Sequence, residues 1–330
     1  MTYTISLSSP SSIIGHKDQI QSLLSDLETG NVAHAYLFTG RKHLGKFTVA
    51  KWFAKKLLTE GVPEEGRERA EQEIDKLLHR DLLVIDQLWI EEVCEDFDVI
   101  AKSSNVPQAH RSKQPTAKTD TIGIDDIRAL QDRLREVGTG AFRCCLIRSA
   151  ERLQEEAVNA LLKILEEPPE GVVFLLTGVS TSHLLPTLVS RSRVLRFASL
   201  SPQEMKPLAG GMPPDDAQFL LRVAQGAPGM VMRLKADPDL LRKERQRAAW
   251  AQGFWGAGSL AERLKLLEPL SDRGEEASRA LLHLSLALRE ERERMDPRCA
   301  EALTALVGDL QTNVSRPLVL QKFVFAVSST

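Results

Sequence analysis

The chain has 330 residues, a formal net charge of −2, 42% hydrophobic residues and 27% charged residues. This length is too great for one ordinary domain and fits two or three. No apolar run reaches the roughly 18 residues that a membrane helix needs, so no membrane contact is expected. A protein that holds DNA by itself usually carries a strong basic excess, and this composition has none.

Cysteine usage points to a reducing compartment. The four cysteines are Cys94, Cys144, Cys145 and Cys299. They form no C-x-x-C pair, so neither a zinc site nor a disulfide framework is predicted. Residues 1–12 have no basic residue ahead of their short apolar stretches and do not read as a signal peptide. We therefore expect a cytoplasmic protein without a metal site of its own.

Short apolar runs alternate with amphipathic stretches over the first 200 residues. The apolar runs predict strands at residues 34–38, 82–85, 144–147, 172–176 and 194–197. Helical spacing of apolar residues predicts helices at residues 46–58, 124–136 and 154–166. Strands that alternate with helices are typical of a parallel sheet with crossover connections.

The pattern changes after residue 200, where no convincing strand run follows and helical stretches dominate. The predicted fold class is therefore α/β plus all-α. A parallel-sheet domain is expected over residues 1–199, a small helical lid over 200–236 and a helical domain over 237–330. Residues 89–118 do not fit the alternation, and their polar second half predicts a mobile loop.

A glycine-containing turn lies between the first predicted strand and the helix that follows. Gly40, Gly45 and Lys46 fit the pattern G-x-x-x-x-G-K, in which backbone N–H groups surround a phosphate and the lysine reaches the terminal phosphates. The next residue should be a Ser or Thr whose hydroxyl ligates Mg²⁺. It is Phe47, whose ring cannot ligate the ion. The turn is interpreted as a degenerate nucleotide-binding loop, and a turn without any ligand is the alternative.

An ATPase of this kind also needs an apolar strand that ends in acidic residues, one of which holds Mg²⁺. The strand at 144–147 ends instead in Arg148 and Ser149. Arg148 places a positive charge where a cation should lie, and Ser149 cannot act as a base. Glu151 lies two residues too late, and a solvent-facing charge at the start of a helix is its simpler interpretation. With Phe47, these changes predict a chain that does not hydrolyse ATP and needs no cofactor of its own.

One long block carries a family resemblance. Residues 150–169, AERLQEEAVNALLKILEEPP, resemble the block A-(D/E)-x-(L/M)…A-x-N-A-L-L-K-x-L-E-E-P-P of bacterial clamp-loader subunits. The segment VVFLLTG at 172–178 is similar to the family's sensor strand, and LLPTLVSRS at 184–192 is similar to its L-L-P-T-x-x-S-R-C motif. Shorter similarities extend the resemblance over nearly the whole chain, and it is weakest at 89–118.

The resemblance implies an AAA+ P-loop fold for the first domain and a helical collar, used for oligomerisation, at 237–330. The family contains ATP-hydrolysing gamma/tau motors and delta-prime subunits whose ATP motifs are commonly eroded. The damaged motifs here, and the lack of the family's four-cysteine zinc module, favour a stator of the delta-prime type. The implied partners are the gamma/tau and delta subunits of DNA polymerase III and, through the complex, the sliding clamp and primed DNA.

The resemblance also assigns roles to the segment around Arg191. The arginine of the family's Ser-Arg-Cys motif faces the ATP of the adjacent subunit, so Arg191 is expected to be an arginine finger in trans. Ser190 would position its turn, and ATP-Mg would be held by the neighbour. Without the family, a basic solvent-facing edge formed by Arg191, Arg193 and Arg196 is the simpler interpretation.

Two other functions remain open from the sequence. The chain is an ATP-hydrolysing motor of the gamma/tau type if Lys46 is active and Glu151 is recruited as the acid. It is a non-catalytic AAA+ adaptor outside the replisome if Arg191 meets no nucleotide.

Overall fold

The computed structural model describes residues 13–85, 121–291 and 296–328. The segment 89–118, whose second half is predicted to be a mobile loop, lies outside these residues. Contacts within the chain divide it into two compact units, Met1–Ala217 with Ala224–Val231 and Gln218–Val223 with Met232–Thr330. The three-domain division at residues 199 and 236 stays a prediction.

The first unit is built on a five-stranded sheet in the order β2-β3-β4-β1-β5, in which every neighbouring pair is parallel. The strands are β1 (Ala35–Thr39), β2 (Leu82–Ile85), β3 (Arg143–Ile147), β4 (Val172–Gly178) and β5 (Arg193–Arg196). The first four are buried along their whole length, as parallel strands covered on both faces must be. The predicted parallel sheet is confirmed, and each predicted strand lies within two residues of the observed one.

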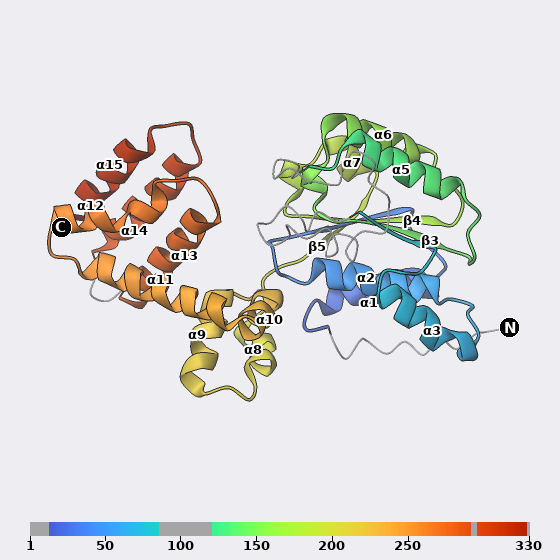
Figure 1. Cartoon of the computed structure of the whole chain (residues 1–330), viewed down its shortest axis with the longest axis horizontal. Coiled ribbons are helices and arrows are strands. Elements are labelled where there is room, and N and C mark those ends of the chain that lie inside the picture. The colour runs from blue at the N-terminus through green and yellow to red at the C-terminus, as the bar shows by residue number, and fades with distance from the viewer. Residues whose placement is uncertain (1–12, 86–120, 292–295, 329–330) are drawn as a thin grey trace. The chain divides into compact units, whose positions relative to one another are not determined.

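Helices cover both faces of this sheet (Figure 1). On one face lie α1 (Lys17–Glu28), α2 (Lys46–Leu58) and α3 (Glu64–Asp75), and on the other lie α5 (Ile124–Arg135), α6 (Glu155–Glu166) and α7 (Pro186–Ser190). The short helices η2 (Ala150–Arg152) and η3 (Thr181–His183) follow β3 and β4. Leu37, Phe174 and Leu161 are among the buried side chains that join the sheet to α6 in one core.

Short helices follow the last strand, as the change of pattern after residue 200 predicts. They are α8 (Pro202–Met205), η4 (Lys206–Ala209), α9 (Pro214–Ala224) and α10 (Pro228–Ala236). Three of them begin at proline, whose fixed φ suits the first turn of a helix. In α8 the Ser201 hydroxyl and the Glu204 carboxylate form a capping box.

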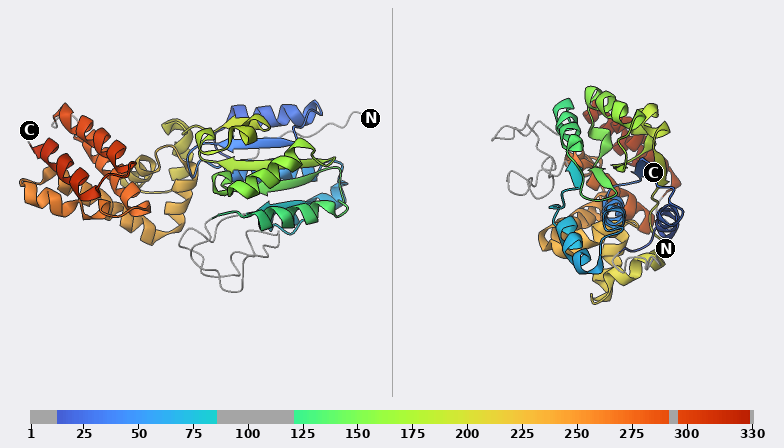
Figure 2. Two further views of the ribbon diagram at one scale, coloured as in Figure 1. Left: turned by 90° about the horizontal axis from the view of Figure 1, so that it is seen from above. Right: turned by 90° about the vertical axis from the view of Figure 1, so that its right-hand side faces the viewer.

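The helices from α11 onward form the body of the second unit, drawn from orange to red in Figure 2. They are α11 (Pro238–Gly256), α12 (Leu260–Leu266), η5 (Glu268–Leu270), α13 (Glu275–Glu290), α14 (Pro297–Leu310) and α15 (Arg316–Ser328). The rings of Phe254 and Phe323 stack with centroids 5.6 Å apart and tie α11 to α15. The indole N–H of Trp255 donates to the carbonyl oxygen of Leu284 at 3.0 Å, so this buried polar group is satisfied.

A cluster of buried charges also joins α11 to α13. The carboxylate of Glu244 is 1% exposed and accepts hydrogen bonds from Arg247 at 2.7 Å, from His283 at 2.6 Å and from Arg279. Burial alone would raise the pKa of Glu244. The hydrogen bonds from His283 and Arg279 outweigh that effect and lower the pKa to about 2. Glu244 therefore stays ionised in the folded chain at neutral pH.

Candidate functional site

The glycine-containing loop lies between the end of β1 and the start of α2, as predicted. Gly40 has a φ of 147°, and a Cβ at this position would lie 2.4 Å from the carbonyl oxygen of Phe197, so only glycine fits. Gly45 has a φ of 89° and is the N-cap of α2, which begins at Lys46. The free N–H groups of the first turn of α2 therefore face the loop, in the arrangement that binds phosphate in related motifs.

Lys46 turns back onto this loop. Its ammonium group donates to the carbonyl oxygens of Gly40 and Arg41, the latter at 2.6 Å. Burial lowers the pKa of Lys46 to about 8, and the positive charge of Arg148 acts in the same direction, while Glu151 opposes it. The ammonium group is therefore partly removed from solvent, and a further cation, Arg148, acts on it.

The two residues that break the metal-binding pattern contact each other. The guanidinium of Arg148 lies over the ring of Phe47, with its central carbon 4.9 Å from the ring centroid. A phosphate-loop ATPase places a hydroxyl and a carboxylate at these two positions to hold Mg²⁺. A phenyl ring and a guanidinium offer no oxygen ligand, and the guanidinium repels a divalent cation. These residues do not fit Mg²⁺.

The residues after β3 form hydrogen bonds with residues at the end of β4. Ser149 has a left-handed φ of 58°, and its backbone N–H donates to the Thr177 hydroxyl at 3.0 Å. The Glu151 carboxylate accepts from the backbone N–H of Val179 at 3.3 Å and interacts electrostatically with Lys46. The interpretation of Glu151 as a solvent-facing charge is therefore wrong, because the carboxylate joins the end of β3 to the end of β4.

The loop is also held by contacts that the sequence did not indicate. The buried imidazole of His16 donates from Nε2 to the carbonyl oxygen of Leu44 at 2.7 Å. The backbone N–H of Gly229 donates to the carbonyl oxygen of His43 at 2.8 Å, and a Cβ on Gly229 would lie 2.9 Å from that oxygen. Glycines near predicted turns are the one sequence signal for such a close approach of two backbones.

Arg191 lies directly after α7 and two residues before the edge strand β5. Its Nη2 donates to Oε1 of Glu166 at 2.7 Å, and its Nη1 donates to the carbonyl oxygen of Thr187 at 3.4 Å. The side chain is 36% exposed. The Ser190 hydroxyl donates to the same Thr187 carbonyl at 3.0 Å and closes the last turn of α7. The partner Glu166 was not singled out from the sequence, although it belongs to the E-E-P-P end of the long block.

The register of the sheet separates Arg191 from the chain's own loop. Arg193, at the start of β5, pairs with Tyr36 near the start of β1, whereas the loop leaves β1 after Thr39. Arg191 therefore lies at the amino edge of the sheet and the loop at its carboxyl edge. At about 3.3 Å per residue, the strand alone separates them by about 10 Å. The structure does not bring Arg191 together with Lys46 in one cleft.

The simpler interpretation of a basic edge is only partly supported. Arg193 ion-pairs with the buried carboxylate of Asp26, which also accepts a hydrogen bond from the Tyr36 hydroxyl at 2.8 Å. This arginine anchors β5 to α1, and its side chain is at the same time 39% exposed. Arg196 is exposed.

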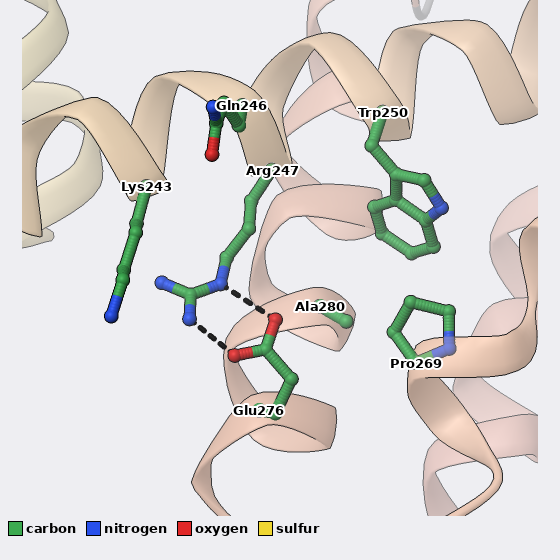
Figure 3. Close-up of a pocket in the computed structure, with 7 residues that line it drawn as sticks. All are labelled: Lys243, Gln246, Arg247, Trp250, Pro269, Glu276 and Ala280. Carbon is green, nitrogen blue, oxygen red and sulfur yellow. Dashed lines mark hydrogen bonds and ion pairs between the residues drawn. The ribbon is translucent and has the colours of Figure 1, made fainter.

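A separate hollow of about 360 Å³ opens in the second unit (Figure 3). Its lining comes from α11, η5 and α13 and consists of Lys243, Gln246, Arg247, Trp250, Pro269, Glu276 and Ala280. Both nitrogens of one edge of the Arg247 guanidinium bond to the carboxylate of Glu276, as the dashed lines in Figure 3 show. The charges of Arg247 and Glu276 in this hollow are thus paired with each other.

The fold and the site together define a class of protein. A parallel sheet with a G-x-x-x-x-G-K loop between β1 and α2, followed by helices, is the AAA+ α/β fold that the sequence predicted, and here Phe47 and Arg148 stand where such a fold can hold a metal ion. Within the described ranges, no helix combines the length and the apolar character that crossing a membrane requires. A family model described as DNA polymerase III, delta subunit, matches residues 15–201. The chain belongs to this family of clamp-loader proteins.

Curated relatives are similar over part of their length. The chain is 27% identical over 225 residues to DNA polymerase III subunit gamma/tau of Mycobacterium bovis, which covers 66% of this chain and 34% of the relative. It is 29% identical over 203 residues to DNA polymerase III subunit tau of Escherichia coli, which covers 59% of this chain and 26% of the relative. The chain thus spans only about a third or less of these relatives.

Solved structures resemble the chain over most of its length at low sequence identity. A gamma subunit-related protein of Thermotoga maritima covers 93% of this chain and 98% of its own, with a TM-score of 0.44 and 16% identity. A RuvB variant from the same organism covers 93% of this chain and 88% of its own, with a TM-score of 0.45 and 18% identity.

Proposed function

We propose that this chain is a stator of the delta-prime type in a bacterial DNA polymerase III clamp loader. It supports ATP-driven loading of the sliding clamp onto primed DNA and hydrolyses no ATP itself. Arg191 serves as an arginine finger for the ATP-Mg that a neighbouring gamma/tau motor binds. The observation that carries this proposal is the stacking of Arg148 on Phe47 at the positions where a motor would hold its metal.

The position of Arg191 supports its proposed role as an arginine finger. It lies at the amino edge of the sheet, away from the loop of its own subunit, and its side chain is partly exposed. A cation in that place contributes nothing to phosphate chemistry within the chain. It is accessible to a second subunit, where a guanidinium stabilises the charge that develops on a transferring phosphoryl group.

We expect the purified chain to show no ATP turnover above the rate without protein, with or without primed DNA. The reason is that Mg²⁺ lacks both of its protein ligands at Phe47 and Arg148. Phosphate release in the presence of Mg-ATP measures this directly, and Lys46→Ala should leave the background rate unchanged. Turnover that Lys46→Ala abolishes would instead establish a motor of the gamma/tau type.

The last helix supports assembly with other subunits. On α15 the side chains of Val319, Phe323 and Val324 are buried in the helical unit. Leu318 and Phe325 lie two turns apart on another face of the helix and are 61% and 56% exposed. Large apolar side chains aligned on an exposed stripe are typical of a surface that another protein covers. We assign this stripe to the collar formed with the gamma/tau and delta subunits.

The double variant Leu318→Ser, Phe325→Ser should assemble with gamma/tau subunits at least about tenfold more weakly. Each side chain loses the free energy of burial in the collar, while the folded chain alone loses little because both are exposed. Sedimentation of the mixed subunits gives the affinity, and Ala305→Ser on the exposed side of α14 is the matched control. Unchanged co-sedimentation with gamma/tau would assign the stripe to another role, and a chain that never co-purifies with them would favour the adaptor outside the replisome.

A further inference from the structure

We propose that Glu166 is a positioning residue for Arg191. Its carboxylate holds the guanidinium in place before the neighbouring subunit arrives, and it remains bound while the other N–H groups meet the phosphates. This inference rests on the proposed role of Arg191 as a finger that acts on an adjacent subunit.

The two side chains meet between two helix ends. Glu166 is the last residue of α6, and Arg191 is the C-cap of α7. The bond between Nη2 and Oε1 is 2.7 Å long, in the range of a charge-assisted hydrogen bond. The carbonyl oxygen of Thr187 accepts from Nη1 at 3.4 Å on the other side. The guanidinium is thus held at two points by groups from two elements.

A carboxylate is poorly placed at the end of α6 for reasons of stability. The C-terminus of a helix carries partial negative charge, so Glu166 is unfavourable there unless a cation compensates it. The pair with Arg191 supplies that cation, but both side chains are half-exposed, at 50% and 36%, and an ion pair at such a surface stabilises a fold only slightly. The pair is therefore better explained by the geometry it gives to Arg191 than by the stability of the chain.

The donor count shows that Glu166 and a phosphoryl group are compatible partners. A guanidinium has five N–H groups, and Glu166 and Thr187 take one each. Three N–H groups of the five are not used by these two bonds, and a phosphoryl oxygen can accept from them. A long arginine side chain that is already ordered loses less rotamer freedom when it binds its target. Glu166 therefore pre-organises the finger without using up its donors.

The same contact would have the opposite effect on the rate of ATP hydrolysis if Glu166 held Arg191 away from the phosphates. A carboxylate that has to release the arginine competes with the phosphates, and its removal would speed hydrolysis. A carboxylate that positions the arginine is needed during hydrolysis, and its removal slows the reaction. The sign of the change therefore separates the two roles.

The test uses the reconstituted loader with this chain at full length. Every motor subunit except the one that receives Arg191 carries an alanine in place of its phosphate-loop lysine, so that one site accounts for the measured turnover. We expect Glu166→Gln to lower the maximum rate by about 3- to 10-fold with an unchanged KM for ATP. Glu166→Asp should recover part of the rate, and thermal unfolding of the free chain should not change.

Three comparisons make the outcome decisive. Glu167→Gln, which removes the adjacent exposed carboxylate, is the matched control and should leave the rate unchanged. In an Arg191→Ala background, Glu166→Gln should have no further effect, and an independent loss there would overturn the positioning role. A faster rate or no effect of Glu166→Gln, while Arg191→Ala slows the reaction, would also overturn it. If Arg191→Ala itself has no effect, the proposed finger is wrong, and the fault does not lie with Glu166.

Discussion

Replacing Arg191 with alanine is expected to slow ATP hydrolysis at the adjacent motor site by about 10³-fold or more. The guanidinium supplies positive charge and a fork of donors at the transferring phosphoryl group, and alanine supplies neither. Because the side chain is partly exposed, its loss should change the free energy of unfolding by less than about 1 kcal/mol. The measurement is phosphate release by a reconstituted loader in which that single motor site is competent.

Two further variants separate a finger from a general charge effect. Arg191→Lys keeps the charge but lacks the planar fork, so it should recover only a small part of the rate. Arg196→Ala removes an exposed arginine from the neighbouring edge strand and should leave the rate unchanged. Equal effects of Arg191→Ala and Arg196→Ala would show that the edge acts through its net charge. Wild-type turnover with Arg191→Ala in an assembled complex would exclude the finger.

The sheet was predictable because its strands are buried on both faces. A strand in that position is mostly apolar, so β2 and most of β3 stand out in the sequence as the runs LLVI and CCLI. Helix α2 was predicted with the observed bounds, because the loop glycines fix its start and apolar spacing fixes its length. The degenerate ATP site stays a prediction, which rests on the residue types at 47 and 148, since neither a phenyl ring nor a guanidinium offers an oxygen ligand to a metal ion.

The partners of charged side chains were not predictable in the same way. The contact of Arg148 with Phe47 joins residues about a hundred positions apart, and no local periodicity encodes it. The ion pair between Arg191 and Glu166 depends on the way α6 and α7 end at one edge of the sheet. Glu244 lies in the charged run RKERQR, which is typical of a solvated helix face, and yet it is buried. Such contacts depend on the tertiary arrangement of elements.

Glu244→Ala should destabilise the helical unit by about 3–5 kcal/mol. The substitution removes the acceptor shared by Arg247, Arg279 and His283, so that Arg279 loses its ion pair with Glu244, while Arg247 keeps its pair with Glu276. Hydrogen exchange of the amides in α11 and α13 of the full chain measures the loss, because these are the two helices that the cluster joins. Glu276→Gln also removes a carboxylate from Arg247, but Glu276 is 58% exposed, so this control should cost less than about 1 kcal/mol.

The pH dependence of the same unit provides an independent check. The pKa of Glu244 is about 2 in the folded chain and 4.5 ordinarily, so the unfolded state binds the proton first as the pH falls. Its contribution, on the order of 3 kcal/mol, is fully present above about pH 4.5 and is lost as the pH falls towards 2. Glu244→Gln lacks this titration. As the pH falls from 4.5 towards 2, the wild type should lose its advantage, and the stabilities of the two proteins should converge. A difference between the two that stays constant over this range would show that the carboxylate is not held ionised by its cationic partners.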